Sequence, residues 1–402
     1  MLGLEIRPDI VFEGEKKPVR EDGVLVVRHA PEIPWEVAAL EWDWRNNKME
    51  QSGVNRENCQ LVIMPNMGDV TNSLYRDLQK NQLGAYPVAI TREESFNDGE
   101  YEILVDDGVR KAESVYLIGS LLSEFDYFRA MRVADYYKDI LNAEIVTLVS
   151  PFLGFGRGDK NVDSGGNYVS RTIPIRTVMK ALGAFVDRIM VFESHSSATQ
   201  VAGLVNGISV APFTPCFFMM DELRKKEQFS REDSVFVRPD FGRNIAARRA
   251  ERYLGIPGVG FNKKRLSGTE IEVMELTGEE QALVRGRKAV IFDDEASSME
   301  TIWEIANLLE TYGVKGVYVC LAHCKFTRGW RDRIKHSLFK IVLGTDSRCP
   351  VGNIEMSGVI KKVSLTPLIK ELIQADIEGV NFWEDERYRQ MILQTQPEER
   401  KK

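Results

Sequence analysis

The sequence has few cysteines, no excess of positive charge and no long apolar run. Its five cysteines, at 59, 216, 320, 324 and 349, have no paired metal-ligand spacing. Cys320 and Cys324, with His323 between them, form only a weak zinc pattern. An odd number of cysteines without a recognisable signal peptide leads us to expect a cytoplasmic protein. No apolar stretch approaches the ~18 residues that a membrane-spanning helix needs, so no membrane partner is expected.

The charge balance argues against nucleic acid as a partner. The chain of 402 residues has 53 Lys and Arg against 60 Asp and Glu, which gives a net charge of −7. Its aromatic residues are not interleaved with basic runs, as they often are in nucleic-acid-binding proteins. A chain of this length is also too long for one ordinary hydrophobic core. We therefore expect two domains and an additional segment.

Short apolar runs alternate with amphipathic stretches from about residue 59 onward. The first block predicts strands and helices, the strands at 59–64, 86–90, 101–105, 114–118, 144–149 and 188–193 and the helices near 69–80, 126–141 and 171–183. The second block predicts strands at 234–237, 258–261, 288–292, 316–321 and 339–343, and helices at 243–254, 300–312 and 328–336. This alternation is typical of βαβ units and predicts an α/β fold with a largely parallel sheet in each half.

Two adjacent carboxylates follow one of these strands. Ala289 to Phe292 suit a buried strand, and we expect Asp293 and Asp294 at its tip, because an unpaired carboxylate is too costly to bury. Hydroxyl groups then precede the next helix, whose first N–H groups can bind an anion, at Ser297, Ser298 and Thr301. This order is how α/β proteins present a ribose phosphate at the carboxyl end of a parallel strand. A strand end followed by a helix-capping loop explains the segment alone equally well.

Four other segments place polar groups where a predicted strand ends. A glycine-rich run at 154–158 is followed by polar residues, and Arg157 and Lys160 there can make charge-assisted contacts to phosphate. The other three segments carry an imidazole, a carboxylate and a group of cations, at His195, Asp240 and Lys263–Arg265. Each of them has a purely structural explanation in isolation. Their common position at strand ends favours one shared site.

In chain order these segments resemble the ribose-phosphate diphosphokinases (phosphoribosyl pyrophosphate synthetases). The resemblance covers about 60–382 and is carried by Phe96–Glu100, Gly154–Lys160, His195, Pro239–Gly242, Lys263–Arg265 and Asp293–Asp294. It implies two phosphoribosyltransferase-like (Rossmann-like) parallel-sheet domains, which we place at 59–210 and 211–361. Residues 1–58 are then an N-terminal extension, and 362–402 is expected to pack back onto the first domain.

The resemblance also implies an activity. Members of this family transfer the β,γ-diphosphate of ATP to the anomeric hydroxyl of ribose 5-phosphate with the help of Mg²⁺. The product, phosphoribosyl pyrophosphate, would serve nucleotide or NAD biosynthesis. The family assembles into dimers and hexamers, so we expect a homo-oligomer.

Site residues carry over from the family position by position. The resemblance assigns ATP binding to Phe96, Asp98, Glu100, Arg157 and Asp159, the first three reaching the site from a neighbouring subunit. It assigns Mg²⁺ to His195 and Asp240, and stabilisation of the transferring phosphoryl group to Lys263 and Arg265. It assigns the ribose hydroxyls to Asp293 and Asp294, and the 5-phosphate to Ser297, Ser298 and Thr301.

The phosphate loop departs from the family, which usually has Asp-Thr-x-Gly-Thr where this chain has Ser297–Thr301. Glu300 takes the glycine position. A carboxylate ~4 Å from a phosphate charge costs about 1 kcal/mol in water and about 4 kcal/mol at an effective dielectric constant of ~20. Either Glu300 points outward, or the acceptor is a 5-substituted ribose with less charge there, such as ADP-ribose. A catalytically silent regulatory homologue is the other alternative, although retention of both Lys263 and Arg265 favours an enzyme.

Overall fold

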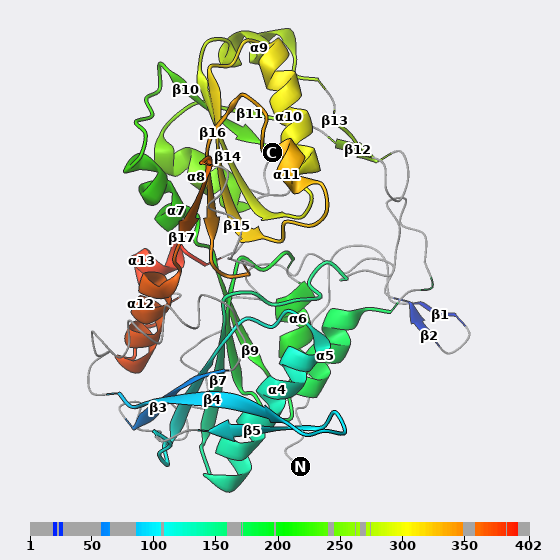
Figure 1. Ribbon diagram of the computed structural model, residues 1–402, viewed down its shortest axis with the longest axis vertical. Coiled ribbons are helices and arrows are strands. Elements are labelled where there is room, and N and C mark those ends of the chain that lie inside the picture. The colour runs from blue at the N-terminus through cyan, green and yellow to red at the C-terminus, as the bar shows by residue number, and fades with distance from the viewer. Residues whose placement is uncertain are drawn as a thin grey trace.

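The protein forms two α/β domains, one above the other in Figure 1. The computed structural model describes residues 58–64, 86–105, 108–158, 170, 172–196, 198–239, 245–261, 275–348, 358–382 and 384–392, and the backbone of 19–21, 24–26, 263–265 and 271–273. Each domain contains a mainly or entirely parallel sheet between helices, which confirms the predicted fold class. The helix predicted near 69–80 lies outside the described residues.

The first domain is built on a seven-stranded sheet of order β5-β4-β3-β6-β7-β8-β9. Its strands are β3 (Cys59–Ile63), β4 (Val88–Ser95), β5 (Tyr101–Val105), β6 (Ser114–Ile118), β7 (Ile145–Ser150), β8 (Arg188–Phe192) and β9 (Ser209–Phe213). All neighbours are parallel except β4 and β5, which form an antiparallel hairpin. This hairpin extends away from the sheet as an arm (Figure 1). Arg129 on α4 ties the arm to its own domain, because its guanidinium donates two hydrogen bonds to Glu93 on β4.

Three helices cover one face of this sheet: α4 (Glu124–Asp135), α5 (Pro174–Leu182) and α6 (Ala198–Leu204). A single π-helical turn, η2 (Tyr136–Ile140), continues α4, so the predicted helix at 126–141 is two segments in the structure. Tyr127, Val133 and Met179 are among the residues that pack the three helices onto the sheet. The π-helical turn η2 carries a buried tyrosine, Tyr137, which joins the same core.

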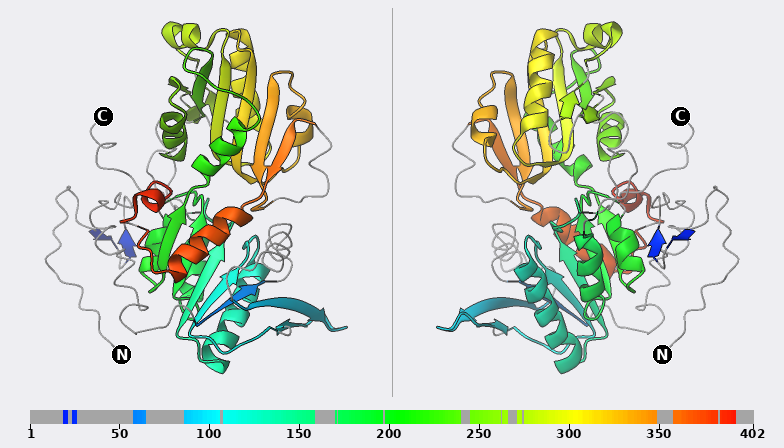
Figure 2. Two further views of the ribbon diagram at one scale, coloured as in Figure 1. Left: turned by 90° about the vertical axis from the view of Figure 1, so that its left-hand side faces the viewer. Right: turned by 90° about the vertical axis from the view of Figure 1, so that its right-hand side faces the viewer.

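A helix from the far end of the chain covers the opposite face. This helix, α12 (Thr366–Ile377), lies across the first domain's sheet in both views of Figure 2. Asp376 on α12 accepts hydrogen bonds from Arg188 Nη2 at 2.6 Å and from the Tyr116 hydroxyl at 2.7 Å. All three side chains are inaccessible to solvent, so the carboxylate and the guanidinium neutralise each other inside the core. The chain therefore returns to the first domain after completing the second. The short helix α13 (Glu386–Arg389) follows it.

The second domain has a six-stranded, fully parallel sheet of order β11-β10-β14-β15-β16-β17. Its strands are β10 (Ser234–Arg238), β11 (Gly258–Gly260), β14 (Lys288–Ala296), β15 (Gly316–Cys324), β16 (Phe339–Thr345) and β17 (Ile360–Val363). Helices α7 (Cys216–Arg224) and α8 (Ile245–Leu254) pack on one face. Helices α9 (Gly278–Val284), α10 (Glu300–Thr311) and α11 (Trp330–Arg333) pack on the other.

Two small antiparallel pairs complete the described chain: β1 (Val19–Glu21) with β2 (Val24–Val26), and β12 (Lys263–Arg265) with β13 (Ile271–Val273). The cations predicted at 263–265 therefore lie on a short strand that follows β11. The helix predicted at 328–336 is shorter than expected, since α11 spans only Trp330–Arg333. The domain boundaries proposed from the sequence stay predictions.

Strand β14 differs most from its prediction. It continues to Ala296 instead of ending at Phe292, so Asp293 and Asp294 belong to the strand and not to a loop beyond its tip. Asp293 pairs with Leu321 and Glu295 with His323 on β15. The strand tolerates these charges because it ends at the boundary between the two domains, where the first domain supplies partners for Asp294 and Glu295.

Candidate active site

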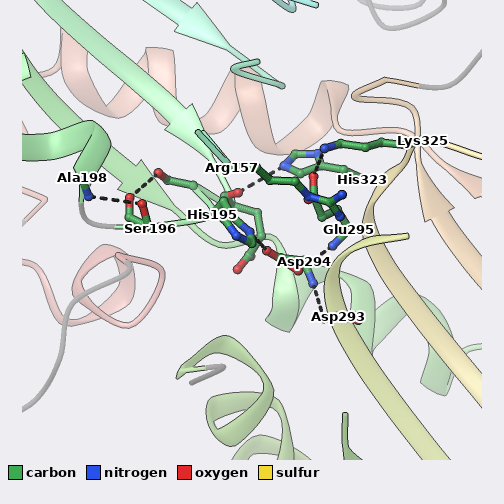
Figure 3. Close-up of polar contacts among 11 residues, drawn as sticks. Arg157, His195, Ser196, Ala198, Asp293, Asp294, Glu295, His323 and Lys325 are labelled. Atoms are coloured by element: carbon green, nitrogen blue, oxygen red, sulfur yellow. Dashed lines mark hydrogen bonds and ion pairs between the residues drawn. The ribbon is translucent and has the colours of Figure 1, made fainter. Parts of the chain in front are cut away.

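A cavity opens at the boundary between the two domains, where β8 of the first domain approaches β14 and β15 of the second. Its wall carries charged and ionisable side chains from both domains, among them Arg157, His195, Asp294, Glu295, His323 and Lys325 (Figure 3). Because each strand ends here with its carboxyl end toward the other domain, polar groups distant in sequence come together at one place.

His195 and Asp294 make the central contact of this site. His195 follows the buried strand β8, and its Nδ1 lies 2.7 Å from Oδ2 of Asp294 on β14. Burial opposes ionisation of Asp294, but the hydrogen bond and charge of His195 outweigh it and hold the pKa of this carboxyl below its ordinary value. The structure thus brings the predicted metal-binding histidine within hydrogen-bonding distance of a predicted ribose-binding carboxylate.

Arg157, predicted to bind ATP, also reaches across the boundary. Its Nε donates to Oε1 of Glu295, while the ammonium of Lys325 pairs with the other carboxylate oxygen of Glu295. Glu295 is buried, and Figure 3 shows the three side chains converging. A buried carboxylate with a cation on each oxygen is well compensated for the loss of water. The pair Arg157–Glu295 therefore links the predicted nucleotide loop to the strand that carries the predicted ribose-binding residues.

His323 forms a third link between the domains. Its Nε2 lies 3.2 Å from the backbone oxygen of Glu193 in the first domain, and its Nδ1 lies 2.8 Å from the Ser347 hydroxyl in the second. Burial lowers the pKa of His323 to about 4, so the ring is neutral near pH 7. A neutral ring that faces a carbonyl must carry its proton on Nε2, which makes Nε2 a donor to Glu193. His323 consequently orients the segment that leads to His195.

Glu193 is itself held tightly. Its backbone adopts a positive φ of 42°, uncommon for a residue other than glycine, and its N–H donates to Phe213 on β9 at 2.6 Å. The Thr214 hydroxyl donates to the side-chain carboxylate at 2.5 Å. Burial raises the pKa of Glu193 to about 8 against the effect of this hydrogen bond. The bend at Glu193 turns the chain so that His195 faces the second domain.

The predicted 5-phosphate loop connects β14 to α10. Met299 has φ 64°, and its turn places Glu300 as the first residue of α10. The loop is fixed by the second domain, since Thr327 N donates to Ser297 O at 2.8 Å and Arg333 Nη1 to Ser298 O at 3.1 Å. Ser297, Ser298 and Thr301 are partly exposed, and the free N–H groups of the first turn of α10 lie beside them.

Glu300 has a partner other than a phosphate. Its carboxylate accepts a hydrogen bond from Arg333 Nη2 at 2.8 Å, and its side chain is 58% exposed. As the first residue of a helix, a carboxylate is also favoured by the helix dipole. This geometry agrees with the alternative in which Glu300 points outward from the loop.

The predicted adenine-binding residues lie elsewhere in the chain. Phe96, Asp98 and Glu100 form the turn at the tip of the β4–β5 arm, and none of them lines the cavity. The Asp98 carboxylate accepts from the N–H of Glu100 at 3.0 Å, and Gly99 occupies a positive φ of 92° that suits glycine. Phe96 is left 49% exposed, which is unusual for a large aromatic side chain.

Several predicted site residues lie outside what the structure describes. Asp159 and Asp240 are among the undescribed residues, and only the backbone of Lys263 and Arg265, in β12, is described. Among the described residues, no group of three or more His, Cys, Asp or Glu is arranged to hold a metal ion. Cys320 and Cys324 also join different cores on opposite faces of the sheet, which argues against zinc.

Glu295, Lys325 and Glu193 line the cavity but were not predicted as members of the site. A signal existed for two of them. Glu295 directly continues the Asp293–Asp294 pair, and Lys325 follows His323 at the end of the next strand. Both residues lie beyond the apolar runs that predicted these two strands, so neither was placed at a strand end.

A cavity lined by carboxylates, imidazoles and cations between two parallel-sheet domains of this topology is characteristic of a two-domain phosphoribosyltransferase-like protein. No protein-family model matches the sequence. A ribose-phosphate pyrophosphokinase of Aquifex aeolicus is 30% identical over 290 residues, 71% of this chain and 88% of the relative. One of Ralstonia nicotianae is 26% identical over 290 residues, 71% of this chain and 86% of the relative. The chain belongs to the ribose-phosphate pyrophosphokinase family and is an enzyme of the diphosphotransferase type.

The fold agrees with this assignment. The crystal structure of phosphoribosylpyrophosphate synthetase from Mycobacterium smegmatis superposes with a TM-score of 0.64 at 21% identity, covering 80% of this chain and 99% of that one. Within the described residues, no helix is long and apolar enough to cross a membrane.

Proposed function

We propose that this enzyme transfers the β,γ-diphosphate of ATP to the anomeric hydroxyl of ribose 5-phosphate. The hydroxyl oxygen attacks the β-phosphorus, the bond from that phosphorus to the α,β-bridging oxygen breaks, and AMP leaves with the electron pair while the hydroxyl proton is lost. The products are phosphoribosyl pyrophosphate and AMP. The observation that carries the proposal is the 2.7 Å contact between His195 and Asp294, which joins the predicted nucleotide side of the cavity to the predicted ribose side.

The charges around the cavity suit such a reaction. Phosphoryl transfer depends on positioning and charge neutralisation more than on covalent chemistry. In the proposal Arg157 and Asp159 hold the nucleotide, Lys263 and Arg265 neutralise the transferring group, and Asp293 and Asp294 accept hydrogen bonds from the ribose hydroxyls. The 5-phosphate binds the loop before α10, at Ser297, Ser298 and Thr301.

Magnesium is the cation that the family and the chemistry favour. The Asp294 carboxylate on the cavity wall suits a hard cation better than the buried thiols do. His195 and Asp240 would hold it, and it would neutralise the negative charge that develops on the phosphates. His195 is 42% exposed and faces the cavity, so its ring is accessible to a ligand.

Ribose 5-phosphate is the acceptor we place first. ADP-ribose would be favoured by repulsion between Glu300 and a doubly charged phosphate, and the ion pair with Arg333 reduces that repulsion. Because Glu300 is paired with Arg333, the loop can bind the doubly charged 5-phosphate of ribose 5-phosphate without removal of this carboxylate.

A homo-oligomer is the final part of the proposal. The exposed Phe96 at the tip of an arm that projects from its own domain is suited to contact a neighbouring subunit. If it does, a mixture of inactive Glu100→Ala and Lys263→Ala chains regains part of the activity in hybrid sites. Full activity in a monomer during sedimentation would contradict this.

The test is a phosphorus NMR assay with ATP, Mg²⁺ and either ribose 5-phosphate or ADP-ribose. We expect AMP and phosphoribosyl pyrophosphate signals with ribose 5-phosphate, and a clear preference for it over ADP-ribose. Asp294→Asn should weaken use of the acceptor, whereas the surface variant Asp332→Asn should behave like the wild type. Nucleotide binding without turnover of any acceptor would instead identify a catalytically silent homologue.

A further inference from the structure

The domain boundary carries more cationic side chains than the proposed function uses. Besides Arg157, the cavity wall carries Lys325 directly after β15, and Arg348 after β16 lies against the same aromatic ring as Lys325. Lys325 Nζ lies 5.5 Å and Arg348 Cζ 5.0 Å from the centre of the same Phe152 ring. Glu295 is the carboxylate in direct contact with Arg157 and Lys325.

The three cations are crowded and partly removed from water. Burial and the charges of Arg157 and Arg348 lower the pKa of Lys325 to about 7, and burial and Arg157 lower the pKa of Arg348. The charge of Asp294 raises the pKa of Lys325. The Asp294 carboxylate is hydrogen-bonded to His195, however, and the nearby His323 ring is neutral. Among the described residues, Glu295 is the carboxylate that contacts these crowded cations, and a further anion in the cavity would stabilise them.

We infer that Lys325 is a further substrate-binding residue, which with Arg157 receives the phosphates of the nucleotide, and that the Glu295 carboxylate occupies the place of a phosphate oxygen until the nucleotide binds. The inference rests on the proposed function for the identity of the ligand as a nucleoside triphosphate. The 5-phosphate of the acceptor is not the ligand meant here, because its loop before α10 does not line this cavity.

This arrangement makes Glu295 an internal competitor of the nucleotide. When the phosphates arrive, Arg157 and Lys325 exchange one oxygen anion for another, so part of the binding free energy is spent on releasing Glu295. Removing the carboxylate charge should consequently tighten nucleotide binding, and removing the ammonium should weaken it. A purely structural ion pair would behave differently, since loss of either partner would disturb the same site in the same direction.

The experiment is calorimetric titration with Mg²⁺ and an ATP analogue that has a methylene group between the α- and β-phosphates, which prevents transfer. We expect Lys325→Met to weaken binding by about tenfold or more, the size of a charge-assisted hydrogen bond. Lys325→Arg should bind within a few-fold of the wild type. Glu295→Gln should bind several-fold more tightly, and should gain less when Lys325→Met is also present.

The matched controls come from a surface pair of the same type on and after α7, Glu222 and Lys225. Glu222→Gln and Lys225→Met should leave the affinity unchanged. Unchanged affinity in Lys325→Met, or weaker binding in Glu295→Gln of native circular dichroism, would overturn the inference. If Glu295→Gln does not fold, the comparison of Lys325→Met with Lys325→Arg decides alone.

Failure of the inference and failure of the proposed function are distinguishable. The titration needs no turnover, so an enzyme that binds the analogue as expected but converts no ribose phosphate would refute only the proposed reaction. An active enzyme whose affinity for the analogue does not depend on Lys325 would refute only the inference.

Discussion

The buried ion pair between Arg188 and Asp376 gives the sharpest stability prediction. Asp376→Asn keeps the shape of the side chain but leaves the Arg188 guanidinium, which is fully buried, without its carboxylate. Removing one partner of a buried pair costs about 3–5 kcal/mol, and we expect the lower part of this range because the amide can still accept a hydrogen bond. At roughly 2–4 °C per kcal/mol for domains of about this size, Tm should fall by about 6–12 °C.

The assay is thermal and urea unfolding followed by circular dichroism. Asp332→Asn is the control, since its pair with Lys335 is exposed on both sides and should contribute about 0–1 kcal/mol. A second variant tests the physical reason: Tyr116→Phe, Arg188→Met and Asp376→Leu together replace the hydroxyl, the guanidinium and the carboxylate that bond to one another, and should recover most of the lost stability. A cost for Asp376→Asn no larger than that of the control would refute the reasoning and mean that α12 contributes little to holding the first domain.

Three further predictions concern the site. Lys263→Ala and Arg265→Ala should each lower kcat by roughly 10²–10³ while changing nucleotide affinity much less, and unchanged turnover in both would remove them from the mechanism. Glu300→Gly should shift the ratio of kcat/KM for ribose 5-phosphate to that for ADP-ribose by less than about threefold, because Arg333 already neutralises the Glu300 carboxylate. A shift approaching the ~4 kcal/mol expected of a carboxylate that faces the phosphate would show that Glu300 points at the phosphate. Nucleotide binding should be strongest below pH 7 and weaken above it, because Lys325, whose pKa is lowered to about 7, must take up a proton at higher pH before it can bind the phosphates. Calorimetry from pH 6 to 9 checks this, and the same pH dependence in Lys325→Met would assign the effect to another group.

The first domain shows how much local pattern can determine. Short apolar runs such as the one in β7, all of whose residues are buried, predict strands, because an apolar run this short and bounded by turns is typical of a fully buried strand. Their alternation with helices leads to parallel sheets with little further information. The order of polar groups at strand ends then indicates the family, and the family resemblance predicts Arg157, His195 and Asp294 as site residues.

Other features were decided only by the tertiary structure. The length of β14 depends on partners for Asp294 and Glu295 that come from the first domain, so no window of local sequence reveals it. The same holds for Lys325, whose neighbours Arg157 and Arg348 are distant in the chain. The orientation of Glu300 is fixed by Arg333, thirty-three residues later.

The sequence by itself determined which chemical groups are present and in what order, because hydrophobic period and strand-end position are local properties. Only the tertiary structure decided which charges neutralise one another, since the free energy of a buried charge depends on neighbours that the fold brings within a few ångströms. Asp376 is the clearest case: at the end of α12 it has the sequence context of a surface carboxylate, yet the return of the helix to the first domain places it against Arg188 in the core.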